Sequence, residues 1–178
     1  MRKLNALLYL FLISLVSLTA CTDDDDDAEP GVAPKTFNIN GKTRSLNIAG
    51  ALDLSGLSND SDTYVLVLTT TTEDHHVTIG LNAPQNSTSL AGTYTAYTQG
   101  NETAPNTFSY AYIGLDCTDD PDNEDELLCQ EEYETAQPPA GSVTITEDGN
   151  DYIVDFDITF ENNQRGRGNY RGPVVIIE

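Results

Sequence analysis

Basic residues are scarce in this chain. Its 178 residues contain 8 Lys and Arg against 29 Asp and Glu, a formal net charge of −21 at pH 7. Nucleic-acid phosphates require a basic surface, so this balance argues against a nucleic-acid partner. It equally argues against a chain that lies flat on an anionic bilayer. It favours a soluble surface that attracts divalent cations.

Tryptophan is absent, which leaves tyrosine as the aromatic residue for a sugar-binding platform. The tyrosines that can stack on a pyranose ring are Tyr94, Tyr97, Tyr110 and Tyr112. The sequence also lacks a G-x-S-x-G nucleophile motif and a glycine-rich phosphate loop. No catalytic and no cofactor-binding residue is therefore predicted.

Histidine occurs only as the adjacent pair His75 and His76. Neighbouring residues of a strand point to opposite faces, so the two imidazoles cannot bind one metal ion there. They can do so only in a turn, where Glu73 and Asp74 would assist. A surface loop without metal is the simpler interpretation.

The first twenty residues have the layout of a secretory signal. Arg2 and Lys3 supply the positive start, and residues 4–18 are mostly apolar. The quartet 18–21, L-T-A-C, resembles the lipobox of bacterial lipoproteins. The resemblance implies cleavage before Cys21 and lipidation of that residue, so that acyl chains attach the protein to a membrane. The alternative is an ordinary signal peptide that leaves a free Cys21.

An acidic run, Asp23–Asp27, follows directly. It resembles the export signal of Bacteroidota lipoproteins, which implies the outer membrane and the cell surface. A second interpretation of the same residues is a solvated tether, because five like charges repel one another. Pro30, Gly31 and Pro34 extend this flexible spacer to residue 35.

Residues 36–178 predict one β domain, because apolar residues alternate and no long stretch has helical spacing. Asn40-Gly41 is typical of a tight type I′ hairpin turn. Residues 64–68 are apolar on both faces, as in a central strand. Phe108, Tyr110 and Tyr112 follow one another at the spacing of a single strand face. We expect an all-β antiparallel sandwich of about eight strands, with a small closed barrel as the alternative.

The last two long strands predict their own register. A three-residue loop at 161–163 would pair Thr159 with Arg165, Asp157 with Arg167 and Asp155 with Asn169. The opposite face would pair phenylalanine and isoleucine with glycine, Phe156 with Gly168 and Ile158 with Gly166. A five-residue loop preserves the same faces.

If Cys21 is acylated, Cys117 and Cys129 remain as a disulfide pair in an oxidising envelope. A metal site is the rival interpretation, and the sequence shows no histidine nearby to complete a zinc set. The bridge would close an acidic insertion over residues 116–140, expected as a loop. Within it, residues 124–133 are the one candidate for a helical turn or two.

Two groups of carboxylates are candidates for chemistry. Oxygen ligands at alternating positions of the insertion suggest a calcium site, although the glycine and the terminal glutamate of an EF-hand are missing. The candidate calcium ligands are Asp119, Asp120, Asp122 and Glu124. The alternative is a solvated acidic loop. Asp155 and Asp157 have the spacing of a glycosidase pair, but Arg165 and Arg167 across from them favour a salt-bridge ladder instead.

The function predicted from these features is non-catalytic binding, by a lipid-anchored surface module of unknown ligand. A glycan or another envelope protein is the expected partner. The alternatives are a hydrolase that uses carboxylates of the acidic insertion, and a purely structural envelope protein.

Overall fold

The computed structural model describes residues 35–55, 60–72, 74–121 and 123–177, with only the backbone at 123–126. The described residues form twelve strands and one short 3₁₀ turn, η1, at Glu161–Asn163. The strands are β1 Thr36–Ile39, β2 Lys42–Ser45, β3 Ile48–Asp53, β4 Ser61–Thr69, β5 His75–Pro84, β6 Gly92–Ala96, β7 Thr107–Asp120, β8 Asn123–Glu134, β9 Ala140–Asp148, β10 Asp151–Phe160, β11 Gln164–Gly172 and β12 Val175–Ile177. The all-β prediction is confirmed.

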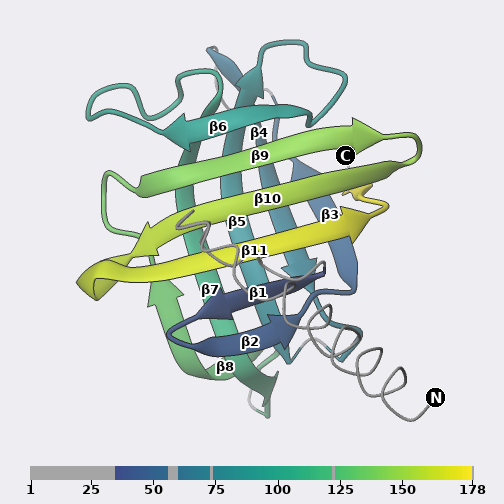
Figure 1. Ribbon diagram of the computed structural model, residues 1–178, viewed down its shortest axis with the longest axis vertical. Coiled ribbons are helices and arrows are strands. Elements are labelled where there is room, and N and C mark those ends of the chain that lie inside the picture. The colour runs from purple at the N-terminus through teal and green to yellow at the C-terminus, as the bar shows by residue number, and fades with distance from the viewer. Residues whose placement is uncertain (1–34, 56–59, 73, 122, 178) are drawn as a thin grey trace, which may run out of the picture. The chain divides into compact units, whose positions relative to one another are not determined.

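The strands of the β domain belong to one continuous sheet, ordered β12-β3-β4-β5-β7-β6-β9-β10-β11-β1-β2, with β8 paired to β7. The sheet curls into a half-barrel, and β9, β10 and β11 cross in front of β4, β5 and β7 at a steep angle (Figure 1). Two pairs, β6–β7 and β12–β3, are parallel. The expectation of a purely antiparallel sheet is therefore wrong, and a sandwich of two separate sheets is not confirmed.

The register predicted for β10 and β11 is confirmed. Thr159 pairs with Arg165, Asp157 with Arg167 and Asp155 with Asn169, across the three-residue turn η1. Asn162 and Asn163 both have φ near +60° there, a conformation that asparagine tolerates better than most residues.

Side-chain alternation explains why this register holds. The buried face of β10 carries large apolar side chains, including Phe156 and Phe160. The glycines of β11 make room for them: a Cβ on Gly168 would lie 2.3 Å from the Phe156 ring, and one on Gly166 2.6 Å from the Phe160 ring. A one-residue slip would turn these rings toward solvent.

The Asn40-Gly41 turn between β1 and β2 is also confirmed, with φ values of +51° and +75°. These positive angles match the two central positions of a type I′ turn. Strand β1 then pairs with β11 on its other edge.

One apolar core lies inside the curl. Its members come from both halves of the sheet, and the largest fully buried side chains include Phe37, Tyr94, Phe108, Ile113 and Tyr170. Burial of this kind contributes about 25 cal/mol per Å² of apolar surface. The core therefore fixes which face of each strand remains available to a ligand.

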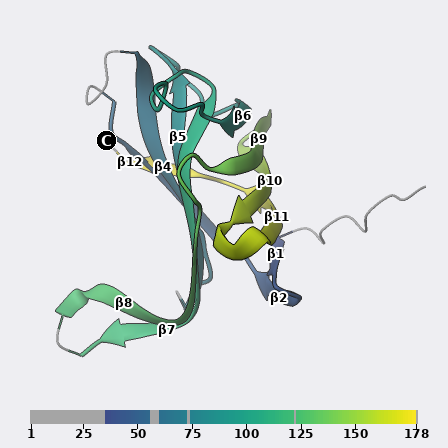
Figure 2. The same cartoon turned by 90° about the vertical axis from the view of Figure 1, so that its left-hand side faces the viewer.

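The acidic insertion is a long β-hairpin rather than a loop. Strands β7 and β8 pair antiparallel, from the Tyr112 and Glu134 pair to the Asp120 and Asn123 pair. The hairpin extends beyond the rest of the sheet (Figure 2). The one candidate for helical turns, residues 124–133, is not helical, because this segment belongs to strand β8. Pairing with β7 along one edge satisfies the backbone groups of alternate residues, and this tertiary pairing overrides the helix propensity of its Glu and Leu residues.

Candidate ligand-binding face of the sheet

The outer face of β5 and β7, turned away from the core, carries the aromatic residues of interest. Cross-strand pairs bring Gly80 beside Tyr110 and Thr78 beside Tyr112. Both tyrosines are half-buried. They are two residues apart on the same strand, so their side chains lie on one face about 7 Å apart.

A β-bulge determines this exposure. The β5–β7 register shifts between Gly80 and Leu81, where Gly80 pairs with Tyr110 and Leu81 with Phe108, so that Ser109 is the extra residue. Phe108 is consequently fully buried while Tyr110 points outward. The expectation that Phe108 shares one face with Tyr110 and Tyr112 is wrong, because the bulge shifts the alternation.

Gly80 leaves room for the ring of Tyr110. A Cβ at this position would lie 2.3 Å from Tyr110 Cε1 and 2.7 Å from Ser109 Oγ. The ring of Tyr110 therefore packs directly against the backbone of β5. Tyr112 is supported by His76, whose ring stacks on it with centroids 5.3 Å apart and planes 26° apart. Contacts of this kind hold aromatic rings in fixed orientations.

The two tyrosines line a cavity of about 390 Å³. Its other lining residues are Thr78, Ala111, Glu134, Thr135 and Gln137. The Thr135 hydroxyl accepts a hydrogen bond from the Ala111 amide at 3.1 Å, and the Tyr97 hydroxyl donates to Gln137 Oε1. The cavity thus combines aromatic faces with a carboxylate, an amide and hydroxyl groups.

Both phenols are protonated at neutral pH. Burial raises the pKa of Tyr110 above its ordinary value. For Tyr112, burial raises the pKa first, and the hydrogen bond to Glu132 and the charges of Glu132 and Glu134 raise it further. Tyr110 therefore offers a hydroxyl donor beside its ring, while the Tyr112 hydroxyl is engaged by Glu132.

No known protein family, curated protein or solved structure matches the chain. The function has to be inferred from the geometry of the site itself.

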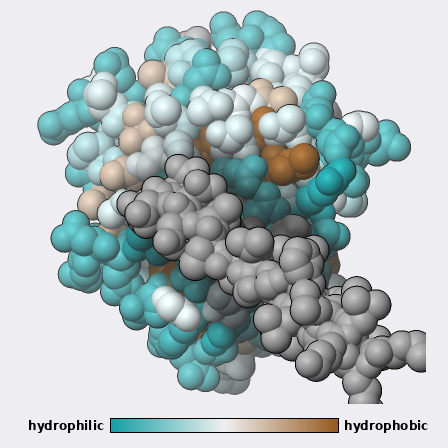
Figure 3. All heavy atoms as spheres, in the orientation of Figure 1, coloured by the Kyte–Doolittle hydropathy of each residue, from teal (hydrophilic) through white to brown (hydrophobic). Residues whose placement is uncertain are grey.

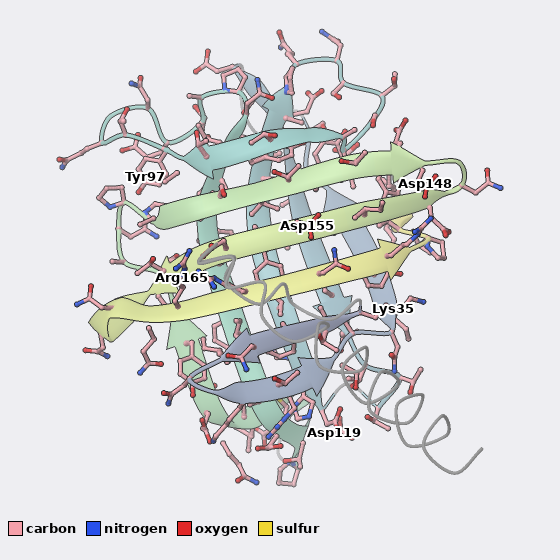
Figure 4. The ribbon with its side chains drawn as sticks, viewed as in Figure 1. Lys35, Tyr97, Asp119, Asp148, Asp155 and Arg165 are labelled. Carbon is pink, nitrogen blue, oxygen red and sulfur yellow. A yellow bond between two sulfur atoms is a disulfide. The ribbon has the colours of Figure 1, made fainter. Side chains whose placement is uncertain are left out.

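Only two of the four tyrosines proposed for a platform lie on this face. Tyr94 is fully buried, its hydroxyl donates to the Leu90 carbonyl at 2.8 Å, and burial raises its pKa to about 12. Tyr97 is 8% exposed and lies beyond the end of β6 (Figure 4). Neither ring is available for stacking on a sugar.

The two histidines lie on opposite faces of β5, as the strand geometry predicts. His75 is buried, and its Nδ1 accepts a hydrogen bond from the Asp116 amide at 3.1 Å. Carboxylate oxygens of Asp74 and Asp116 lie 3.7 and 3.9 Å from its two ring nitrogens. A polar cavity of about 360 Å³, lined also by Arg44, opens beside it. Asp74 is expected beside the histidines from the sequence, whereas Asp116 has no such signal there because it comes from another strand, β7.

The sulfur atoms of Cys117 and Cys129 lie 2.07 Å apart, the distance of a disulfide, as the sequence predicts. The two residues face each other across β7 and β8. The expectation that no histidine lies nearby is wrong, because His76 Nδ1 is 3.7 Å from Cys117 Sγ. Sequence distance concealed this contact, which the pairing of β5 with β7 creates.

Two of the proposed calcium ligands, Asp119 and Asp120, lie at the end of the hairpin. Asp119 pairs with Leu127 and Asp120 with Asn123, and Asp119 lies far from Asp155 and Arg165 (Figure 4). Asp122 and the side chain of Glu124 lie outside the described residues, so calcium binding stays a prediction.

Asp155 and Asp157 form the expected ladder rather than an acid–base pair. Arg165 Nε donates to Asp157 Oδ1 at 2.6 Å, and Arg167 Nε lies 3.3 Å from Asp157 Oδ2. The Asn169 amide donates to Asp155. The hydrogen bond from Arg165, and the charges of both arginines, hold the pKa of Asp157 below its ordinary value. Hydrophilic side chains predominate on this side of the domain (Figure 3).

Proposed function

We propose that this chain is a lipid-anchored envelope protein whose β domain binds a carbohydrate without catalysing a reaction. The anchor is Cys21, supported by the L-T-A-C quartet after an apolar run, and the acidic run behind it supports display at the outer-membrane surface. These residues lie outside the described part of the chain. Among the described residues, no helix is long and apolar enough to cross a membrane.

The observation that carries the carbohydrate proposal is the pair of outward tyrosines at one cavity. Pyranose rings present C–H groups on their faces and hydroxyls around their edges. The rings of Tyr110 and Tyr112 match the faces, while Glu134, Thr135 and Gln137 match the hydroxyls. The strongly negative chain disfavours an anionic glycan, so a neutral one fits best.

The carboxylates near the cavity favour binding over hydrolysis. Glycoside hydrolysis generally uses two carboxyl groups about 5–10 Å apart on either side of the scissile bond. Glu134 lines this cavity, and the neighbouring carboxylate on β8, Glu132, is engaged in a hydrogen bond with Tyr112. The carboxylate pair on β10, Asp155 and Asp157, is held by Arg165, Arg167 and Asn169.

A protein partner is the second candidate, favoured by exposed apolar residues at one edge of the sheet. Leu52 and Ile48 of β3 are 43% and 46% exposed, and Val175 and Ile177 of β12 are 62% and 57% exposed. Pairing places Val175 beside Gly50 and Ile177 beside Leu52. An apolar edge of this kind is typical of an interaction surface.

The test is affinity gel electrophoresis of the Cys21→Ser chain with soluble neutral polysaccharides, namely xylan, mannan and a mixed-linkage β-glucan. We expect retardation by at least one of them, and a loss of roughly five- to thirtyfold in affinity for Tyr110→Ala and Tyr112→Ala, since a stacked ring contributes on the order of 1–2 kcal/mol. Tyr112→Phe keeps the ring and is expected to retain most of the binding.

Tyr152→Ala is the matched control, because Tyr152 is a partly buried tyrosine of β10, far along the sheet from the cavity. Retardation that is unchanged in both Tyr110→Ala and Tyr112→Ala would refute this site. No retardation by any of the three polysaccharides, together with capture of a defined envelope protein that Leu52→Asp abolishes, would favour the protein partner.

A further inference from the structure

One cluster gathers three side chains that metal ions favour. Within the described part of the chain, His76 of β5, Cys117 of β7 and Cys129 of β8 are the only group of three potential ligands whose ligand atoms lie within 4.8 Å of one another. In a tetrahedral zinc site with Zn–S near 2.3 Å and Zn–N near 2.0 Å, ligand atoms are about 3.5–3.8 Å apart. The distance from Cys117 Sγ to His76 Nδ1, 3.7 Å, already has this value.

Gly114 makes this convergence possible. A Cβ at this position would lie 2.6 Å from Cys129 Sγ, 2.6 Å from His76 Cε1 and 3.0 Å from Cys117 Sγ. All three side chains thus pack above the same glycine, which pairs with His76 on one side and with Glu132 on the other. Any larger residue would push the imidazole and the sulfurs apart.

The backbone hydrogen bonds between neighbouring strands keep the cluster assembled. His76 belongs to β5 and the cysteines to β7 and β8, three neighbouring strands of one sheet. Their backbone hydrogen bonds hold the three Cα positions whether or not the sulfurs are bonded to each other. Sites on sheet strands of this kind are more rigid than sites on loops.

We propose that reduction of the Cys117–Cys129 bond converts this cluster into a zinc-binding site. A dithiol reductant supplies two electrons and two protons to the sulfur–sulfur bond and is itself oxidised to a disulfide. Zinc then binds the two thiolates and His76 Nδ1, and the two thiol protons pass to solvent. Water takes the fourth position, as in zinc sites with a Cys₂His ligand set.

The site is therefore gated by redox state. In the oxidised protein the sulfurs are bonded to each other and are poor ligands, since the thiolate is the form that binds metal. In the reduced protein, soft thiolates select zinc over the harder calcium and magnesium ions. The carboxylates of Glu132 and Glu134 along β8 add negative charge beside the cluster, which favours a cation. This proposal does not rest on the carbohydrate proposal, and the two sites meet where His76 stacks on Tyr112.

The test is titration of the reduced Cys21→Ser chain with Co²⁺, which replaces zinc and reports thiolate ligation by absorption in the near ultraviolet. The substitution leaves Cys117 and Cys129 as the only cysteines. We expect thiolate-to-cobalt bands that saturate at one ion per chain, disappear on addition of Zn²⁺, and are absent before reduction. A thiol reagent should find two reactive groups without zinc and none with it.

His76→Gln should weaken Co²⁺ binding at least tenfold and change the visible d–d bands. The adjacent His75→Gln is the matched control, because His75 lies on the opposite face and contacts Asp74 and Asp116; its affinity should stay within twofold. Thr78→Ala serves as a second control if His75→Gln is unstable. Absence of thiolate bands in reduced, folded protein would overturn the proposal. So would equal binding by His76→Gln, or unfolding on reduction that Zn²⁺ does not reverse.

Discussion

Replacing Gly168 with alanine tests the packing of the half-barrel most directly. Gly168 is buried in β11, between Phe156 of β10 and Phe37 of β1. An added Cβ would lie 2.3 Å from two atoms of the Phe156 ring and 2.9 Å from Phe37 Cβ. Both distances are far inside ordinary van der Waals contact, so the rings or the strands have to move.

The expected cost combines two opposing effects. Alanine in place of glycine within a strand stabilises by about 0.5–1 kcal/mol through lower chain entropy, while overpacking of a core costs about 1–3 kcal/mol. The net expectation for Gly168→Ala is a loss of roughly 1–2 kcal/mol. For a domain of this size, that loss lowers the melting temperature by about 3–8 °C.

Urea unfolding followed by circular dichroism measures the effect. Gly50→Ala is the matched control, because Gly50 lies in strand β3 and its Cβ would meet only the Val175 carbonyl at 3.6 Å. That variant should be neutral or slightly stabilised. In a Phe156→Leu background the cost of Gly168→Ala should fall by about 1 kcal/mol, since the clashing ring is gone. Equal stability of Gly168→Ala and Gly50→Ala would refute the packing argument.

Two further predictions concern charge and anchoring. Because the arginines lower the pKa of Asp157 in the folded state, its stabilising contribution is complete above the unfolded pKa near 3.9 and is lost as the pH falls through the lower folded value. The stability difference between wild type and Asp157→Asn, less than about 1 kcal/mol for this 38%-exposed side chain, should be constant from pH 7 to 5 and shrink below about pH 4; a difference unchanged at pH 2.5 would contradict this. Separately, Cys21→Ser should move the protein from the membrane fraction to the soluble fraction, and mass spectrometry should find acyl chains on wild-type Cys21. An unmodified thiol there would reject the anchor.

The sequence was sufficient for features that depend on alternation between neighbouring strands. The β10–β11 register followed from one requirement, that Phe156 and Ile158 share a face opposite glycines while Asp157 meets an arginine. The Asn40-Gly41 turn followed from the rarity of residues that accept two successive positive φ angles. Both are local relationships, and local patterns determine them.

Features that arise from distant pairing could not be predicted in this way. The bulge at Ser109, which turns Tyr110 outward, has no composition signal because it depends on how β7 meets β5. The acidic segment 124–133 resembles a helix in composition and becomes a strand only because β7 offers its edge. His76 and Cys117 are 41 residues apart in sequence and still lie in contact.

The sheet order has a consequence for how the polypeptide acquires its structure. Strand β1 has β11 as its second neighbour and strand β3 has β12, so one edge of each early strand stays open until the last strands are synthesised. Such long-range closure carries a large entropic cost and slows folding. A nascent chain of this topology can form its β1–β2 and β3–β4 pairs early, but it cannot complete the sheet until its final residues emerge.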